Sequence, residues 1–199
     1  MIRAAIAQLS TKDKLLEVAQ ELMLARGFSA TTLDDICTRA GVTKGGFFHY
    51  FKSKDELGQQ VLERFCASGK TMQQQFAKSQ TDPLKRVYAY IDHAMDMARD
   101  PAMSKGCLLG LFSQELCDSN PRIREACKRA FDEWAGGFAK ELAQAKSTYK
   151  VSFDPREVAE HLIAIMEGSM ILGKARRDMS VVVTHLRHYK AYIKALFAQ

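Results

Sequence analysis

Cys107 is the residue whose chemistry would be most distinctive if its surroundings activated it. It follows Lys105 and Gly106 at the expected start of a helix over residues 105–118. A helix N-terminus and a neighbouring lysine both stabilise a thiolate, the form of cysteine that reacts with electrophiles and oxidants. Free cysteine is more often a small buried hydrophobic residue. Both interpretations stay open, because the leucines that follow could bury the thiol and raise its pKa.

Metal-binding and catalytic patterns find little support. His185 and His188 are three residues apart and would share one face of a helix, but no third ligand lies near them in sequence. Cys107, Cys117 and Cys127 are spaced by ten residues, which suits no known arrangement of zinc ligands. The chain also has no phosphate-binding glycine loop and no Gly-x-Ser-x-Gly motif. We therefore expect no metal, no cofactor and no enzymatic activity.

A basic stretch is the pattern that points most clearly to a partner. From Arg39 to Lys54 the sequence has four cationic residues, His49 and no acidic residue. Residues 44–51 would form a helix of roughly 12 Å, which fits inside the major groove of B-DNA. Lys44 stands at its front, and Gly45 lacks a side chain, so the backbone there can approach a partner closely. The stretch favours nucleic acid, and the alternative is an ordinary helical hairpin with a solvated basic face.

Local signals predict the helices that would hold this stretch. Thr32 can cap a helix over residues 33–40, with Asp35 as its capping-box partner. Gly41 can end that helix in a left-handed conformation, and Thr43 is the next capping residue. The pattern is a helix, a glycine turn and a short second helix.

The segments ARGFSATTLDDI and AGVTKGGFFHYFKSKDEL resemble the DNA-recognition region of the TetR family of bacterial transcriptional repressors, over about the first 60 residues. The resemblance implies DNA contacts from residues of this region, namely Thr32, Thr43, Lys44, Gly45, Phe48, His49, Tyr50 and Lys54. Within this set we expect Thr43 and Lys54 to contact phosphates. The family usually has a tyrosine at the position of Phe48, so the hydroxyl group that would meet a phosphate is missing here.

The segment GCLLGLFSQELCDSNPRIR resembles one branch of that family, in which some members respond to electrophiles or oxidants through a cysteine at this place. The resemblance implies that Lys174 can lie near Cys107. We also expect a ligand cavity, and its candidate residues are apolar or adaptable side chains, namely Phe112, Trp134, Met95, Met166 and Met170. At helical spacing such residues are more often ordinary core, and the sequence does not separate the two.

Length and composition set the broad class. A chain of 199 residues with 47% apolar residues fits one or two globular domains. The net charge of +6 favours an acidic partner, although acidic residues are spread throughout. Five cysteines without paired short spacing suit a reducing cytoplasm. Residues 1–10 do not form a signal-peptide pattern and no apolar run of about 18 residues occurs, so we expect a cytoplasmic protein without a membrane partner.

The remaining sequence predicts further helices and no sheet. Asp82, Asn120 and Asp154 each precede a proline, the arrangement of a capping residue and a first helical position. Pro101 would stop the helix that starts at residue 83. In all, we expect helices near residues 12–26, 33–40, 44–51, 54–78, 83–99, 105–118, 121–145, 155–177 and 180–198. The predicted fold is all-α, with a three-helix helix-turn-helix DNA-binding head over residues 1–52 and a helical bundle for sensing and dimerisation over residues 53–199.

The last two predicted helices carry more apolar surface than one buried stripe needs, which is typical of helices in an intermolecular four-helix bundle. Together the patterns predict a homodimeric transcriptional regulator, a repressor whose heads bind a palindromic operator in double-stranded DNA. A small-molecule or electrophile effector would release it, in one version by modifying Cys107. The alternative is a helical small-molecule-binding protein without DNA function, and a more distant one is an enzyme built on a helical bundle.

Overall fold

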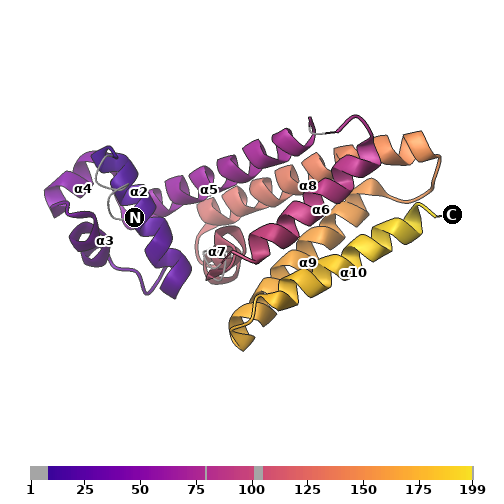
Figure 1. The fold of residues 1–199 in the computed structure, drawn as a ribbon. Coiled ribbons are helices and arrows are strands. Elements are labelled where there is room, and N and C mark those ends of the chain that lie inside the picture. Colours follow the sequence, from indigo (N-terminus) through magenta and orange to yellow (C-terminus); the bar gives the residue numbers. More distant parts are fainter. Residues whose placement is uncertain (1–8, 79, 101–104, 199) are drawn as a thin grey trace. The chain divides into compact units, whose positions relative to one another are not determined.

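The computed structural model describes residues 9–78, 80–100 and 105–198. These residues form helices α2 to α10 in chain order, and none of them lies in a strand (Figure 1). The predicted all-α class is therefore confirmed. Pro101, the predicted stop of the helix that starts at residue 83, lies outside the described residues. Within the described ranges, no helix is both long and apolar enough to span a membrane.

The helices begin and end close to their predicted bounds. They are α2 (Thr11–Arg26), α3 (Leu33–Ala40), α4 (Lys44–Tyr50), α5 (Lys54–Phe76), α6 (Pro83–Ala98), α7 (Leu108–Leu116), α8 (Pro121–Tyr149), α9 (Pro155–Arg176) and α10 (Ser180–Leu196). Helix α7 starts later than predicted because Gly106 has a φ of +90°, which lies outside the helical region. Helix α8 continues past residue 145, since no glycine or proline follows Ala145 within it.

Side-chain caps start the helices where the sequence predicts them. Thr32 and Asp35 form the predicted capping box of α3, and Gly41 ends that helix in the left-handed conformation. The carboxylate of Asp82 accepts hydrogen bonds from two backbone N–H groups in the first turn of α6. Asp154 does the same for α9. Because these bonds join residues at most three apart, they depend on the local sequence alone.

The chain forms two compact units. The head unit consists of Met1–Ala67 together with Leu108–Lys128. In it α2 packs on α3 and α7, and α3 packs on α4. Its core is made of fully buried apolar side chains, including Leu15, Met23, Ile36, Phe47, Phe51, Leu57, Val61 and Phe112. The predicted division of function after residue 52 stays a prediction.

The second unit consists of Ser68–Cys107 together with Arg129–Gln199. Helix α10 packs on both α9 and α6. Its core includes Val87, Ile91, Phe138, Leu142, Leu162, Val182, Leu186, Tyr189 and Ile193. The hydroxyl group of Tyr189 donates to the carbonyl oxygen of Val158 at 2.7 Å, so the one polar atom of this buried ring has a partner.

Candidate nucleic-acid interface and sensing residues

Helix α4 is short, and two buried phenylalanines fix its orientation. The side chain of Thr43 caps it by accepting a hydrogen bond from the N–H group of Gly46 at 3.1 Å. Phe47 and Phe51 are almost completely buried, and their ring centroids lie 5.5 Å apart. Because these rings hold one side of the helix in the core of the head unit, the remaining side chains of α4 face solvent.

The two glycines of α4 have different roles. A Cβ atom added at Gly46 would lie 2.9 Å from Cγ1 of Val42, so Gly46 is needed where the preceding turn packs against the helix. A Cβ atom added at Gly45 would meet only Oγ1 of Thr43, at 3.9 Å. Gly45 is therefore open on its outer side, as expected of a position where a partner approaches the backbone.

The side chains predicted to meet DNA from α4 are exposed together. Lys44, Phe48, His49 and Tyr50 all lie at the surface, with 55% of Phe48 and 38% of Tyr50 accessible to solvent. The ring of His49 contacts the ring of Tyr50 edge-on, with centroids 4.8 Å apart. Helix α4 has only seven residues, and its exposed side chains are one cation, one imidazole that can donate a hydrogen bond, and two aromatic rings. Such side chains can contact the phosphates and the base edges of DNA.

Exposed ion pairs compensate part of the positive charge of this segment. The ammonium group of Lys44 lies 2.8 Å from a carboxylate oxygen of Asp34, and a hydrogen bond to that carboxylate raises the pKa of Lys44. Arg39 pairs with Glu21 at 2.8 Å. Thr32 is exposed, and its hydroxyl group donates to Asp35 at 2.6 Å. Exposed pairs contribute little free energy, so Lys44 can exchange Asp34 for a phosphate at small cost.

Lys54 has partners that the sequence did not reveal. Its ammonium group donates to the carbonyl oxygens of Phe28 and Thr31, at 3.1 and 3.0 Å. It also lies 4.4 Å from the centre of the Phe28 ring. These contacts join the start of α5 to the turn between α2 and α3. The phosphate contact predicted for Lys54 stays a prediction, and it would have to compete with these internal bonds.

Glu115 of α7 also holds this turn. The carboxylate of Glu115 accepts hydrogen bonds from the backbone N–H groups of Phe28 and Ser29, both at 2.7 Å. Burial alone would raise the pKa of Glu115, but these bonds and the charge of Lys54 outweigh it and lower the pKa. The ring of Phe112 meets the ring of Phe28 edge-on at 5.6 Å. No local motif signals the Glu115 contact, because its partners lie 86 and 87 residues away.

Cys107 is half-buried directly before α7, and its thiol hydrogen-bonds to the carboxylate of Glu167 on α9. Burial raises the pKa of Glu167, and this bond offsets only part of that effect. The Oε1 atom of Glu167 is buried without a hydrogen-bond partner among the described residues. Lys105 and Lys174, the lysines associated with Cys107 from the sequence, are exposed. No sequence pattern indicated Glu167, the carboxylate whose pKa the Cys107 thiol affects.

The other predicted sensing residues occupy different surroundings. Phe112 is fully buried in the head unit. In the second unit, Met170 is part of the buried core, while Met95 and Met166 are partly buried against it. Trp134 is partly exposed, and its indole N–H group donates to the hydroxyl oxygen of Tyr90 at 2.9 Å. A cavity shared by these residues stays a prediction.

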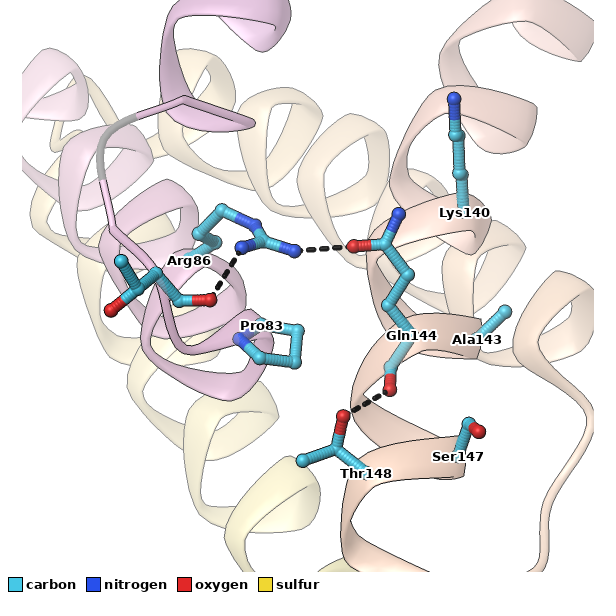
Figure 2. Close-up of a pocket in the computed structure, with 8 residues that line it drawn as sticks. Pro83, Arg86, Lys140, Ala143, Gln144, Ser147 and Thr148 are labelled. Carbon is cyan, nitrogen blue, oxygen red and sulfur yellow. Dashed lines mark hydrogen bonds between the residues drawn. The ribbon is translucent and has the colours of Figure 1, made fainter.

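Two surface hollows occur in the described part of the second unit, and none of the predicted sensing residues lines either of them. The larger hollow has a volume of about 650 Å³ and lies between the start of α6 and the last turns of α8 (Figure 2). The smaller has a volume of about 380 Å³, and its lining includes Arg99, Met179 and Arg187.

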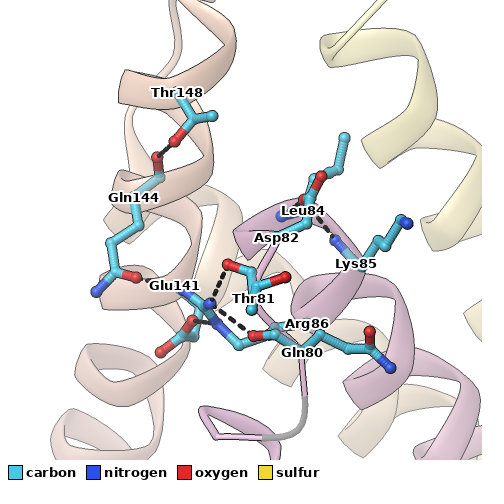
Figure 3. Close-up of polar contacts among 9 residues, drawn as sticks. All are labelled: Gln80, Thr81, Asp82, Leu84, Lys85, Arg86, Glu141, Gln144 and Thr148. Atoms are coloured by element: carbon cyan, nitrogen blue, oxygen red, sulfur yellow. Dashed lines mark hydrogen bonds and ion pairs between the residues drawn. The ribbon is translucent and has the colours of Figure 1, made fainter.

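Arg86 provides the buried charge of the larger hollow, but its donors serve the protein itself. Its guanidinium group donates to Glu141 at 2.5 Å, to Gln144, and to the carbonyl oxygens of Gln80 and Thr81 at 2.9 and 3.0 Å (Figure 3). These bonds tie the segment before α6 to α8. With its donors used in this way, Arg86 is a structural link rather than a ligand-binding group.

Comparison with known families and proteins adds an independent finding. Residues 15–61 match the family model described as "Bacterial regulatory proteins, tetR family". Residues 83–189 match the family model described as "Tetracyclin repressor-like, C-terminal domain". The two matches together span the α4 surface, Cys107 and the larger part of both units.

Individual relatives cover nearly the whole chain. The HTH-type transcriptional repressor DhaR of Mycobacterium sp. (strain GP1) is 28% identical over 176 residues, which is 87% of each chain. The HTH-type transcriptional repressor NemR of Escherichia coli (strain K12) is 28% identical over 190 residues, or 92% of this chain and 94% of NemR. The crystal structure of reduced E. coli NemR has a TM-score of 0.79 at 26% identity, over 91% of this chain and 96% of that one.

Proposed function

Because the chain belongs to the tetR family of bacterial regulatory proteins, we propose that this DNA-binding transcriptional regulator is a homodimeric repressor of a palindromic operator. A small molecule or an electrophile acting on the second unit releases it from DNA. The protein carries out this function in the cytoplasm, where its operator lies, and catalyses no reaction. The named relatives are transcriptional repressors, and this supports repression rather than activation.

The exposed side of α4 is the observation that carries the DNA-binding assignment. Its outward residues are held in place by the buried rings of Phe47 and Phe51, while Lys44, His49 and Tyr50 project into solvent. A preformed and exposed helix of this length can enter a major groove without rearrangement. Thr43 and Lys54 remain the proposed phosphate contacts, and Thr32 belongs to the same surface.

Exposed apolar side chains on α9 and α10 support the homodimer. Ile171 and Leu172 on α9 and Tyr192 on α10 are exposed, although each is large and apolar. A second copy packed on these helices would remove this surface from water and would place two heads on one DNA. The two recognition helices would then have to lie about one DNA turn apart, roughly 34 Å.

Two kinds of signal remain open for the second unit. One is covalent modification of Cys107, with Lys174 as a neighbour that could attack an oxidised sulfur. The half-burial of Cys107 leaves part of the thiol accessible, while its bond to Glu167 gives it a carboxylate partner. The other signal is a ligand bound among the predicted cavity residues, of which Trp134, Met95, Met166 and Met170 belong to the second unit.

The test of DNA binding is a retardation and footprinting experiment with the DNA that flanks the protein's own gene. We expect two protected half-sites about 10 base pairs apart from centre to centre. Lys44→Ala should weaken binding and leave stability unchanged, because Lys44 is exposed. Lys54→Ala should lower the salt dependence by about one unit if Lys54 contacts a phosphate. Failure to retard any flanking fragment would favour a small-molecule-binding protein without DNA function.

Sedimentation tests the homodimer. Wild-type protein should sediment as a dimer, and Ile171→Glu should yield monomers that fold normally but bind the operator weakly. Ile171 is suited to this test because 51% of it is exposed, whereas Met170 next to it is buried in the core. A monomeric wild-type protein at micromolar concentration would contradict the dimer.

A further inference from the structure

One exposed ion pair joins the two helices at the candidate DNA interface. The ammonium group of Lys44, the first residue of α4, lies 2.8 Å from a carboxylate oxygen of Asp34, the second residue of α3. Of the two side chains, 62% of Lys44 and 68% of Asp34 are accessible to solvent. A negative charge therefore lies at the surface beside the first residue of the helix proposed to enter the major groove.

The neighbouring acid, Asp35, has a different task. Its carboxylate accepts hydrogen bonds from the N–H and hydroxyl groups of Thr32 in the capping box of α3, and it pairs with Arg26 at 2.6 Å. Asp35 thus starts α3 and joins it to α2. Among the described residues, Lys44 is the only ion-pair partner of Asp34. The capping box leaves Asp34 out, so its carboxylate is available to act on Lys44 alone.

The pair lowers the attraction of this surface for phosphates. The charge of Asp34 repels the backbone of any DNA, and Lys44 must leave Asp34 before it can pair fully with a phosphate. The ammonium group has three donors, however, and the hydrogen bond to Asp34 uses one of them. Two donors remain at the N-terminal end of α4, the end of a recognition helix that contacts base edges in helix-turn-helix proteins. In the major groove, guanine presents two acceptors, O6 and N7, that a lysine can meet.

We propose that Asp34 is a positioning residue that directs Lys44 to a guanine of the operator and away from the phosphates of other DNA. On the operator, the ammonium group keeps its bond to Asp34 and donates to the acceptors of that guanine. On other DNA, Lys44 gains a phosphate only by leaving Asp34, whose charge then faces the backbone unpaired. Asp34 thereby increases the ratio of operator affinity to nonspecific affinity. This inference rests on the proposed function, in which α4 enters the major groove.

The test compares full-length wild-type protein with Asp34→Asn by fluorescence anisotropy over a range of salt concentrations. The probes are the labelled operator and a labelled DNA of the same composition in scrambled order. Asp34→Asn should bind the scrambled DNA about three- to tenfold more tightly, with a salt dependence steeper by about one unit, because Lys44 gains a phosphate. Operator affinity should stay nearly constant, so the affinity ratio should fall. Equal gains on both DNAs, or no gain on either, would overturn the role of Asp34.

Two controls separate positioning from net charge. Glu63→Gln removes an exposed acid on α5 of the same head unit and changes the net charge equally, so the affinity ratio should not change. In Lys44→Ala, the further change Asp34→Asn should also leave the ratio unchanged, because no ammonium group remains to be positioned. A fall of the ratio in either control would overturn the proposal. Circular dichroism checks folding, which Asp34→Asn should preserve because the side chain is exposed.

Base substitution tests the contact with guanine. Each guanine–cytosine pair of the protected half-sites is replaced in turn by adenine–thymine, which exchanges the O6 acceptor for an amino donor. At one position wild-type protein should lose about fivefold or more in affinity, Asp34→Asn should lose less, and Lys44→Ala should lose nothing further. The absence of any such position would overturn the proposal. Wild-type protein that binds operator and scrambled DNA equally would instead count against the proposed function, and the salt dependence of Asp34→Asn on scrambled DNA would still decide whether Asp34 restrains Lys44.

Discussion

The head unit and the second unit each contain a glutamate packed against a neighbouring element, and the two carboxylates have opposite surroundings. Glu115 in the head unit accepts two short backbone hydrogen bonds, and its pKa is lowered despite its burial. Glu167 in the second unit has one buried oxygen without a partner among the described residues, and its pKa is raised by burial. The carboxylate of Glu115 is thus a satisfied polar contact of the head unit, whereas the carboxylate of Glu167 in the second unit has an unsatisfied oxygen.

This difference fits the roles proposed for the two units, which are DNA binding for the head unit and sensing for the second unit. A DNA-reading surface must be held rigidly, because base contacts depend on placing side chains to a fraction of an ångström. A sensing region must have two states that differ little in free energy. An unsatisfied buried group destabilises the conformation in which it is buried, and this reduces the free-energy difference from a second conformation. Four substitutions test this difference between the two units.

Removal of a buried anchor behind α4 should have the largest effect. Phe47→Ala is expected to lower the free energy of unfolding by about 3–5 kcal/mol, because it empties a fully buried site in the head core. The matched control is Phe48→Ala on the same helix, where 55% of the ring is already exposed and the loss should be well under half as large. Urea unfolding of both variants measures the difference. Equal losses would mean that α4 is not oriented as described.

Glu115→Ala should lower the free energy of unfolding by about 1–3 kcal/mol at pH 7, since it removes the acceptor of two backbone N–H groups. The folded-state pKa of Glu115 lies below its ordinary value of 4.5, so its contribution is present above that pH. The contribution is lost as the pH falls through the folded-state pKa. Gln114→Ala, at an exposed neighbouring position on α7, is the control. A loss that is independent of pH would argue against the carboxylate as its source.

Glu167→Gln should change stability in the opposite direction. The folded-state pKa of Glu167 lies above its ordinary value of 4.5, so ionisation of the folded protein costs free energy as the pH rises. The glutamine variant does not ionise. We expect it to be about 1–2 kcal/mol more stable than wild type at pH 8 and close to wild type at pH 4. Thermal unfolding at the two pH values provides the comparison, and a destabilised variant at pH 8 would show that the charged carboxylate is stabilising.

Phe48→Tyr should have the smallest effect, and only on DNA binding. The added hydroxyl group would lie at an exposed ring, so the free energy of unfolding should not change. One new hydrogen bond to a phosphate should strengthen operator binding by about 1 kcal/mol, or roughly fivefold. Fluorescence anisotropy with labelled operator measures this gain. Unchanged affinity would mean that the ring of Phe48 is not directed at the DNA backbone.

Local sequence was enough to predict the helices and the α4 surface. Thr32, Thr43, Asp82, Asn120 and Asp154 cap their helices as predicted, through bonds to backbone groups two or three residues away. The residues of α4 that are predicted to meet DNA lie within seven positions of one another, so the orientation of one short helix decides their exposure together. Glycine positions, caps and apolar spacing therefore contain nearly all the information about this segment.

The sensing residues could not be predicted in the same way. Phe112, Trp134, Met95, Met166 and Met170 come from several helices, and a residue's type does not show whether it lines a cavity or fills the core. Cys107 illustrates the difficulty, because the neighbouring lysine suggested a cationic environment and the structure supplies the carboxylate of Glu167. That carboxylate comes from a helix 60 positions later in the chain, counted from 107 to 167.

Local sequence patterns are sufficient to predict the all-α class, the approximate helix bounds, the family resemblance and the exposed surface of α4 proposed to contact DNA, because each depends on residues within a few positions of one another. The folded packing, by contrast, places the ammonium group of Lys54 against the carbonyls of Phe28 and Thr31, and the carboxylate of Glu115 against the same turn. These contacts join residues 23 to 87 positions apart in the chain, and packing at that separation leaves no periodic signal in the sequence.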